Sequence, residues 1–243
     1  MKAAALPVLL AALAACAGAP GDPAPSASGP APSAAAGADG WTDLFDGRTT
    51  DGWHGYAQSG VPDVWSVQDG AMVLTPDGGD WDGDLVADGA YDDFELEVEY
   101  RVARCGNSGV FYRGEESADV APIWRTALEA QIVDGCHPDA RYPSHRTGAV
   151  YDLYAPAADA ERPSGAWNTL RVVADGDRIE HWLNGQRVVS AVQGSPEWDA
   201  RLAVSKFRDA GTFPAYGTRR AGIIGLQDHG DTLRVRAVRV RPL

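Results

Sequence analysis

The chain has 243 residues, of which 34 are acidic and 21 are basic, so its formal charge is −13. A protein that binds nucleic acid needs a basic surface against the phosphates, and this acidic balance argues against such a partner. Residues 41–243 have a length that suits one all-β domain, because sandwiches of roughly 200 residues often form a single domain.

The N-terminus predicts export from the cytoplasm. Met1 and Lys2 form a short positive region, and an apolar run extends from Ala3 to Ala15. This run is too short for a helix that spans a bilayer, but it has the length of a signal-peptide core. We therefore predict that residues 1–15 are a signal peptide.

The signal peptide ends at a cysteine. Leu13-Ala14-Ala15-Cys16 resembles the lipobox of bacterial lipoproteins, in which the chain is cut before the cysteine and the cysteine is acylated. The alternative is an ordinary signal peptide in which Cys16 has no special role. Ala17 stands where a retention signal would place Asp, so the resemblance implies an outer-membrane lipoprotein.

Residues 16–40 after the cleavage site predict a disordered tether. Apart from Cys16 they are almost entirely Ala, Pro, Gly, Ser and Asp. Without large apolar side chains, this segment cannot bury enough surface to offset the entropy of ordering. We expect it to connect the lipid anchor to a domain that begins at Trp41.

Period-two patterns dominate the domain. From Phe94 to Val102, apolar residues alternate with charged ones, which predicts a strand with one buried and one wet face. Asn184-Gly185 separates two strand-like runs and predicts a type I′ hairpin turn. Further strands are predicted at 168–174, 178–183, 186–192, 221–227 and 232–240, the last with a β-bulge where its apolar phase changes.

No stretch of the domain shows a sustained helical period. Twenty-eight glycines in the chain, many beside Asp, mark frequent turns. Short strands with turn signals and no helices predict an all-β fold of two antiparallel sheets, as a sandwich or jelly roll.

Two cysteines remain when Cys16 is assigned to lipid. Cys105 and Cys136 each follow a strand-like run, and they could pair in an oxidising compartment. Two free thiols are the alternative. A zinc site lacks the paired CxxC spacing that it would need.

The acidic segment Asp77 to Asp84 is a candidate calcium loop. Counted from Asp80, an EF-hand would need Gly at Leu85 and Glu at Tyr91, and it has neither. We interpret the segment as an exposed acidic turn, while a calcium site of another kind remains open.

Candidate binding residues lie on two predicted strands. Phe111 and Arg113 share one face of the first strand, and Glu129 and Gln131 share one face of the second. These residues could form a solvated sheet face. Arg, Glu and Gln beside aromatic rings are also what a carbohydrate site uses, because they pair with hydroxyls while rings stack on the sugar.

A third candidate stands at the end of the strand predicted at 221–227. Gln227, Asp228 and His229 precede a glycine turn, where a rigid scaffold can present functional side chains. A lone histidine is often structural or simply exposed, so both readings stay open. The sequence has no GxSxG, P-loop, HExxH or paired CxxC motif.

An ordered series of motifs runs through residues 41–243. The series resembles the 3-keto-disaccharide hydrolase domain family, formerly a domain of unknown function. It comprises Trp41-Thr-Asp-Leu-Phe-Asp-Gly, Asp51-Gly-Trp53, Trp65-Ser-Val-Gln-Asp-Gly70, Tyr91-Asp-Asp-Phe-Glu-Leu, Asn107-Ser-Gly, Arg113, Glu129-Ala-Gln-Ile-Val-Asp134, Gly148-Ala-Val-Tyr151, Trp167-Asn168, Asn184-Gly185 and Gly225-Leu-Gln-Asp-His-Gly230. Two segments, Cys136 to Arg146 and Phe207 to Arg220, match no motif of the series.

The resemblance implies a concanavalin A-like jelly roll and an enzyme that cleaves glycosides already oxidised to a ketone at sugar carbon 3. The ketone acidifies the hydrogen on C2, and the glycosidic oxygen on C1 becomes a leaving group. Such a reaction needs a base near C2, a cation or donor at the ketone oxygen, and an acid at the leaving oxygen.

The site residues follow from this chemistry and the resemblance. We predict Glu129, His229 and Asp134 as catalytic residues, with Glu129 or His229 as the base and Asp134 as a second carboxylate or a metal ligand. The predicted substrate-binding residues are Arg113, Gln131, Asn107, Tyr151, Lys206 and Gln227, with Arg113 or Lys206 at the enolate oxygen. Elimination followed by hydration and direct hydrolysis both fit these residues.

Two other functions remain open from sequence. A non-catalytic carbohydrate-binding module could use the same sandwich, since fold does not determine function. A structural envelope protein is the weaker alternative. The expected partners are a carbohydrate and, through the lipid, a membrane; no cofactor is required by the motifs, a divalent cation such as calcium is compatible with them, and no oligomeric state is predicted.

Overall fold

The computed structural model describes residues 39–79 and 82–243. The predicted signal peptide, Cys16 and nearly all of the predicted tether lie outside the described residues, as do Asp80 and Trp81 of the acidic turn. Within the described ranges, no helix has the length and apolar character needed to cross a membrane.

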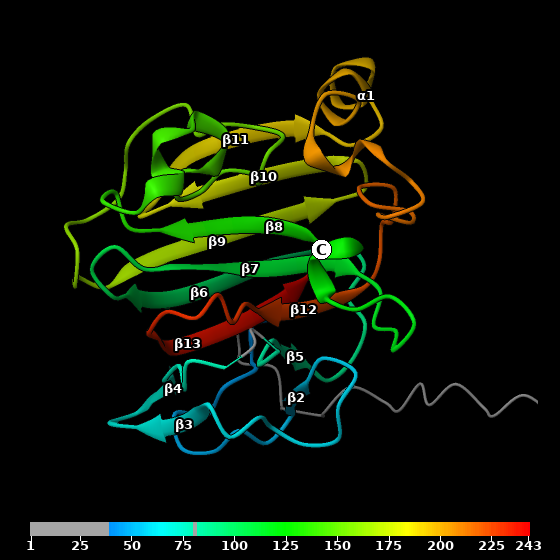
Figure 1. Cartoon of the computed structure of the whole chain (residues 1–243). Coiled ribbons are helices and arrows are strands. Elements are labelled where there is room, and N and C mark those ends of the chain that lie inside the picture. The colour runs from blue at the N-terminus through cyan, green and yellow to red at the C-terminus, as the bar shows by residue number, and fades with distance from the viewer. Residues whose placement is uncertain (1–38, 80–81) are drawn as a thin grey trace, which may run out of the picture.

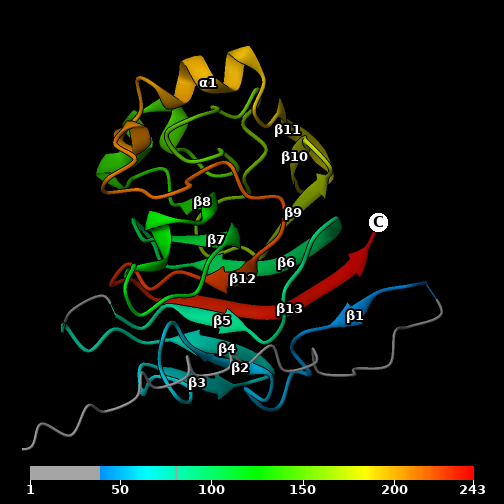
Figure 2. The same cartoon turned by 90° about the vertical axis from the view of Figure 1, so that its right-hand side faces the viewer.

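Two antiparallel sheets stack face to face (Figures 1 and 2). The larger sheet has eight strands in the order β11-β10-β9-β6-β13-β4-β3, with β1 paired to the end of β13. Its strands are β1 (Thr42–Asp43), β3 (Trp65–Gln68), β4 (Ala71–Leu74), β6 (Phe94–Val102), β9 (Asn168–Asp175), β10 (Arg178–Leu183), β11 (Gln186–Val192) and β13 (Leu233–Pro242).

The smaller sheet has five strands in the order β2-β5-β12-β7-β8. They are β2 (Trp53–Gly55), β5 (Leu85–Ala87), β7 (Asn107–Gly114), β8 (Leu128–Val133) and β12 (Ile223–Leu226). The backbone of residues 148–151 hydrogen-bonds to the free edge of β8, since Gly148 donates to Gln131 and Tyr151 donates to Glu129. This segment therefore extends the sheet beside the residues of greatest interest.

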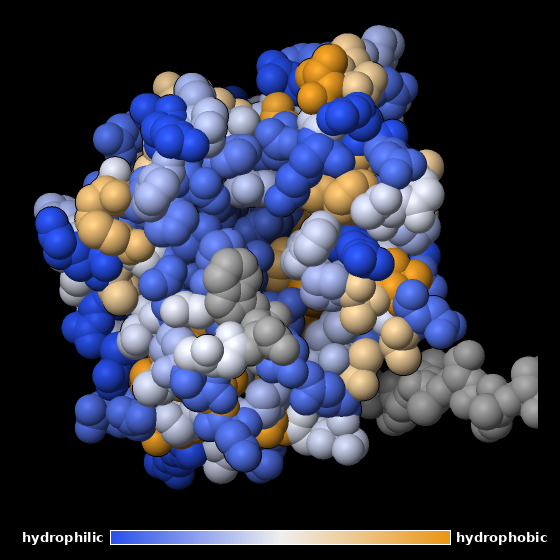
Figure 3. All heavy atoms as spheres, in the orientation of Figure 1, coloured by the Kyte–Doolittle hydropathy of each residue, from blue (hydrophilic) through white to orange (hydrophobic). Residues whose placement is uncertain are grey.

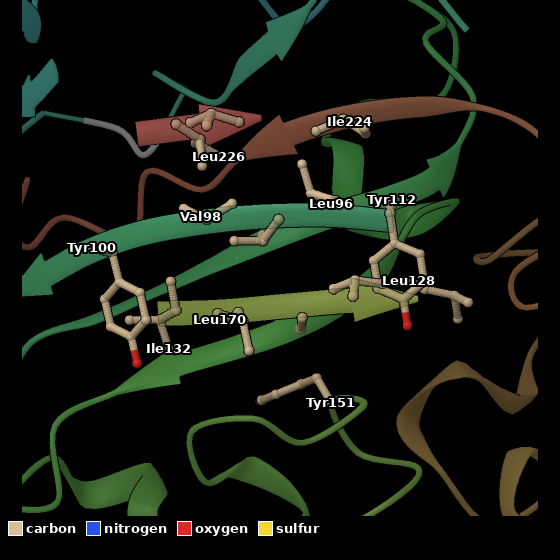
Figure 4. Packing of buried hydrophobic residues seen from close by; sticks show 14 of the residues in the cluster. Leu96, Val98, Tyr100, Tyr112, Leu128, Ile132, Tyr151, Leu170, Ile224 and Leu226 are labelled. Atoms are coloured by element: carbon tan, nitrogen blue, oxygen red, sulfur yellow. The ribbon is translucent and has the colours of Figure 1, made fainter. Parts of the chain in front are cut away.

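The core lies between the two sheets (Figure 4). Leu96, Val98 and Tyr100 of β6 point toward the smaller sheet, from which Tyr112 and Leu128 face back. The alternate residues of each strand point outward. Both sheets therefore present an outer face, and the outer face of the five-stranded sheet carries Phe111, Glu129 and Gln131.

Most predicted strands are confirmed. Phe94–Val102 alternates strictly between buried and half-buried residues, and Asn184 and Gly185 both have positive φ in the predicted hairpin. The register of β13 shifts between Val235 and Ala237, which confirms the bulge. The strand predicted at 221–227 is shorter in the structure, where it forms β12.

The expectation of no helices is wrong in detail. The helix α1 (Pro196–Leu202) lies beyond β11, and four 3-10 turns occur as η1 (Ile123–Arg125), η2 (Pro138–Arg141), η3 (Pro143–His145) and η4 (Lys206–Arg208). Ser195 caps α1 by accepting from the Trp198 N–H, and Pro196 supplies a preset φ at the first turn. Seven residues are too few to show a helical period, so pattern analysis overlooks this element.

Candidate active site

A cavity of about 220 Å³ opens on the outer face of the five-stranded sheet. In the orientation of Figure 1, the space-filling view shows a hollow in front of β7 and β8, with hydrophilic residues around much of its rim (Figure 3). The lining residues are Asp84, Asn107, Trp124, Glu129, Gln131, Tyr151, Lys206, Gln227, Asp228 and His229.

Glu129 lies on the floor of the cavity and is 4% exposed. In the β7–β8 ladder, Glu129 pairs with Phe111, and Gln131 pairs with Gly109. A side chain at Gly109 would collide with the Glu129 carboxylate, because a Cβ there would lie 2.8 Å from the Glu129 Cγ. The glycine of the Asn107-Ser-Gly motif therefore makes room for the carboxylate.

Burial raises the pKa of Glu129 from its ordinary 4.5 to about 7. The positive charge of Lys206 acts in the opposite direction, and the negative charge of Asp139 adds to the rise. A carboxyl with a pKa close to neutrality can exchange a proton readily at the pH of most cellular compartments, so Glu129 has the properties of an acid–base catalyst.

Lys206 lies at the rim of the cavity among aromatic rings. Its Nζ is 4.2 Å from the centre of the Tyr151 ring, 4.9 Å from that of Phe207 and 5.5 Å from that of Trp124. Desolvation lowers the pKa of Lys206, and the charge of Glu129 partly offsets this effect. The rings hold an ammonium group next to the cavity, where it can stabilise a negative charge that develops on a ligand.

Two further carboxyl groups, those of Asp84 and Asp228, line the cavity. Asp84 accepts a hydrogen bond of 2.9 Å from the Asp228 N–H, and Asp228 accepts one of 2.9 Å from the Gly230 N–H. Burial raises the pKa of Asp84 well above its ordinary value, and burial also raises the pKa of Asp228. Both groups therefore favour the protonated form more than an exposed aspartate does, which equips them to donate a proton.

Amide groups complete the wall beside His229. The Nδ2 of Asn107 lies 3.4 Å from the Nε2 of His229, and burial lowers the pKa of His229, as does the nearby His137. Two buried oxygens, Oδ1 of Asn107 and Oε1 of Gln227, have no hydrogen-bond partner among the residues that the structure describes. Buried acceptors of this kind suit the hydroxyl groups of a bound sugar.

Seven of the nine predicted catalytic and substrate-binding residues line the cavity. They are Asn107, Glu129, Gln131, Tyr151, Lys206, Gln227 and His229. The Gln131 Oε1 accepts from the Ile132 N–H at 3.1 Å, which fixes its amide against the strand.

Arg113 does not reach the cavity, contrary to expectation. It has a positive φ of 54°, and the β7–β12 ladder shifts register opposite it, so the alternation that placed it beside Phe111 breaks at this residue. Its buried guanidinium donates to Gln193 at 2.9 Å and pairs with Asp93 at 3.3 Å. Gln193 in turn donates to the carbonyls of Gly217 and Arg219, so Arg113 supports a loop.

Asp134 also lies outside the cavity lining. Its carboxylate accepts hydrogen bonds from the N–H groups of Cys105 and Cys136, at 3.0 and 3.2 Å. Burial would raise the pKa of Asp134, but these donors outweigh that effect and lower it. Asp134 follows the last residue of β8, where the chain turns, and this turn directs the side chain to local N–H groups.

Cys105 and Cys136, whose pairing the sequence left open, form a disulfide in the structure. In the described part of the chain, one group of side chains brings potential metal-ligand atoms close together, and it consists of these two cysteines and Asp134. The disulfide explains why the two sulfur atoms lie together. The calcium loop considered at Asp77 to Asp84 does not form such a group among the residues described there.

Comparisons with known proteins show the family to which the chain belongs. The family model for the 3-keto-alpha-glucoside-1,2-lyase-like domain matches residues 40–241. The chain belongs to this family. A 3-keto-disaccharide hydrolase from Bacteroides thetaiotaomicron is 33% identical over 230 residues, which cover 85% of this chain and 79% of the relative. The predicted family and the prediction of a glycoside-cleaving enzyme are confirmed.

Solved structures support the fold assignment. A protein from Parabacteroides distasonis, assigned as a glycosyl hydrolase, superposes with a TM-score of 0.77 at 28% identity and covers 85% of this chain and 95% of its own. A β-glucanase from Bacillus licheniformis superposes with a TM-score of 0.51 at 12% identity, covering 84% and 97% of the two chains. The second match concerns the fold alone, and together the matches confirm the jelly roll.

In this member of the 3-keto-alpha-glucoside-1,2-lyase-like family, the sequence analysis missed three residues that line the cavity. Asp84 was assigned to an exposed turn, but it immediately precedes the fully buried strand β5, and that position was an available signal. Asp228 stands inside the Gln227–His229 motif and could have been included with its neighbours. Trp124 comes from the 3-10 turn η1, for which the sequence offers no periodic signal.

Proposed function

We propose that this enzyme cleaves glycosides that carry a ketone at carbon 3 of the sugar, and that Glu129 removes the proton on C2. The supporting observation is the buried Glu129 carboxyl, with a pKa of about 7, beside the Lys206 ammonium in one small cavity. An ordinary glycosidase places two carboxyl groups on either side of the bond that breaks. This cavity also holds carboxyl groups, but it adds the Lys206 ammonium, and a ketone substrate needs such a cation at its oxygen while a base removes the C2 proton.

The cavity suits one sugar ring. Its volume of about 220 Å³ is below the roughly 300–1,000 Å³ of clefts that enclose drug-sized ligands. The oxygens of Asn107 and Gln227 would accept hydrogen bonds from sugar hydroxyls. A protonated carboxyl of Asp84 or Asp228 would donate one toward the glycosidic oxygen. The ketone oxygen would then face Lys206.

The reaction proceeds by proton transfers among these groups. The ionised Glu129 takes the C2 proton, and the electron pair moves into an enolate whose oxygen is stabilised by Lys206. The enolate expels the glycosidic oxygen from C1, and a protonated carboxyl of the Asp84–Asp228 pair supplies its proton. Water then adds across the resulting double bond: its oxygen bonds to C1, Glu129 returns a proton to C2, and the water proton passes through His229 to the ionised carboxyl of the pair. The net change is hydrolysis of the glycosidic bond, and every group returns to its starting state.

A turnover assay tests this proposal. Purified enzyme is incubated with a 3-keto-disaccharide and, in parallel, with the same disaccharide lacking the ketone, and the monosaccharides released from each substrate are measured. The proposal expects release only from the oxidised substrate, because without the ketone the C2 hydrogen is not acidic. Equal cleavage of both sugars would contradict the 3-keto preference, and saturable binding without release would favour a binding module.

We also propose that the enzyme is a lipoprotein of the cell envelope, anchored through Cys16. The support is the sequence of residues 1–16 together with the apolar-poor segment that follows. Metabolic labelling with a radioactive fatty acid tests this: label should enter the full chain and be lost in Cys16→Ser. Unchanged labelling in that variant would contradict the anchor.

A further inference from the structure

The segment Cys136–Arg146 matches none of the family motifs, yet it contacts two sides of the cavity. It starts at the disulfide and continues through the turns η2 and η3. It carries two histidines, His137 and His145, and neither lines the cavity itself. Each histidine instead touches a residue that does.

The first contact supports His229. The rings of His137 and His229 meet edge to face, with centroids 6.2 Å apart and an interplanar angle of 89°. On its other side, His229 approaches Asn107, which follows Cys105 by two residues. The disulfide therefore joins the two backbone segments that flank His229, and the Asp134 carboxylate binds both cysteine N–H groups as a second clamp.

The second contact supports Tyr151 and Lys206. His145 stacks on the Tyr151 ring at 4.3 Å, and its Nε2 pairs with the Asp152 Oδ1 at 3.2 Å. The other oxygen of Asp152 accepts the backbone N–H of Lys206 at 2.7 Å. Tyr151 in turn lies beneath the Lys206 ammonium. One histidine thus fixes both the ring platform and the backbone that presents the cation.

We propose that Cys136–Arg146 is a disulfide-anchored support of the active site, in which His137 positions His229 and His145 positions Tyr151 and Lys206. The kinetic part of this proposal rests on the proposed function. Catalytic groups must be held within a fraction of an ångström, and supporting residues behind them provide that rigidity. Both histidines are positioning residues, because neither lines the cavity.

The disulfide gives the two halves of the support different sensitivity to reductant. Cys136 is exposed and Cys105 is half-buried, so a phosphine can reach the bond. Reduction adds two electrons and two protons and leaves two thiols. It frees the residue next to His137, whereas the His145–Asp152 pair and the Tyr151 stacking lie at the far end of the segment.

The experiment follows the ring resonances of His229 by NMR, in the complete mature domain, as a function of pH. Among the described residues, the titratable groups that act on His229 include His137, Asp231 and Asp139, beside the amide of Asn107. We expect His137→Ala to shift and broaden the His229 signals, and phosphine treatment of the wild type to have the same effect. His137→Phe, which keeps the edge-to-face ring, should restore sharp signals. Unchanged His229 signals in both His137→Ala and the reduced wild type would overturn the proposal for His137.

Kinetics with a 3-keto-disaccharide provide the second readout. His137→Ala and His145→Ala should each lower kcat by about 10- to 100-fold with a smaller change in KM. Reduction should reproduce the loss seen in His137→Ala and add little to it. His54→Ala is the matched control. His54 lies on β2 and pairs with Asp88 and Glu116, so this substitution should leave kcat unchanged. Normal kcat in both active-site-support variants would overturn the proposal.

The two readouts separate this inference from the proposed function. If the wild type does not cleave the 3-keto-disaccharide but His229 still responds to His137→Ala and to reduction, the proposed function fails while the support stands. If the wild type cleaves the substrate and His229 does not respond, the support fails alone.

Discussion

The outer faces of both sheets carry glutamates, but the glutamates have different surroundings on the two faces. On the eight-stranded sheet, Glu95, Glu97 and Glu99 of β6 each bind an arginine of β13, at 2.6 to 2.8 Å. On the five-stranded sheet, Glu129 is buried and its pKa rises to about 7 despite the charge of Lys206. A carboxylate that pairs with an arginine has its charge balanced by that partner, whereas a buried carboxylate with a raised pKa can accept a proton near neutral pH.

Aromatic rings show the same difference. On the eight-stranded sheet, Trp41 lies under the guanidinium groups of Arg239 and Arg241, at 4.7 and 4.9 Å from its ring centre, and both arginines also bind glutamates. On the five-stranded sheet, the rings around Lys206 surround an ammonium at the edge of an open cavity. The first arrangement is closed by its own contacts, and the second leaves a place for a ligand.

Among the substitutions considered, Glu129→Gln should lower kcat the most, because it removes the reactive carboxylate of the five-stranded sheet. Removing the base should lower kcat by roughly 10²- to 10⁴-fold. The control Glu97→Gln, on the other sheet, should leave kcat unchanged. Equal kinetics of wild type and Glu129→Gln on a 3-keto-disaccharide would contradict the role of the carboxylate.

The same variant should be more stable than the wild type above neutral pH. The pKa of Glu129 is raised on folding, from 4.5 to about 7, so ionisation destabilises the fold progressively between these values and fully above them. At about 1.4 kcal/mol per pH unit, Glu129→Gln should gain up to about 3 kcal/mol at alkaline pH and nothing below pH 4. Urea unfolding at both pH values measures this, and a gain independent of pH would point to another cause.

The substitution Gly109→Ala should displace the carboxylate without removing it. The added methyl collides with Glu129, so we expect kcat to fall by about 10- to 100-fold while the protein still folds. Gly135→Ala is the matched control, because a Cβ there meets no atom within 4 Å. A crystal structure of Gly109→Ala should show Glu129 shifted; an unmoved carboxylate with normal kcat would refute the explanation for this glycine.

The dependence of kcat/KM on pH should reveal the ionisation of Glu129. The rate should rise with pH through about 7, since the base acts in its ionised form. Lys206 lowers the pKa of Glu129, so Lys206→Met should move this rise upward by roughly 1 pH unit, in addition to reducing the rate. A downward shift in the variant would contradict the assigned interaction.

Breaking an ion pair on the outer face of the eight-stranded sheet should have the smallest effect of all. A double-mutant cycle of Glu97→Gln and Arg239→Gln should give a coupling energy of about 0.2–1 kcal/mol, which salt reduces further, because the pair is partly exposed. Chemical denaturation of the four variants measures this value. A coupling of several kcal/mol would show that this face contributes more than a solvated ladder does.

Sequence patterns predicted the sandwich because period-two alternation reports directly on buried faces, as in Phe94–Val102. The same alternation gives no reason to distinguish Glu97 from Glu129. It shows which face of a strand is polar, but not which residues the neighbouring strands place beside that face. Family motifs located Asn107, Glu129 and His229, whose positions in the cavity depend on long-range pairing. Geometry alone showed that Glu129 is buried and Glu97 is paired.

The wrong prediction for Arg113 has a local cause. Alternation assumes regular backbone, and a positive φ at this residue turns its side chain away from the cavity. Asp84 was misplaced for a different reason, because an acidic run normally indicates an exposed turn and its last member is buried here. Bulges and the ends of charge runs are therefore where pattern analysis needs coordinates.

The most direct test of the contrast between the two faces is the pKa of Glu129 itself, measured by NMR on protein labelled with ¹³C at the glutamate carboxyl carbons and assigned with Glu129→Gln. The account predicts a Glu129 signal that titrates at about 7, well separated from that of Glu99, whose pKa is lowered by its hydrogen bonds with Arg236. A Glu129 carboxyl that titrates near 4.5 would contradict the account.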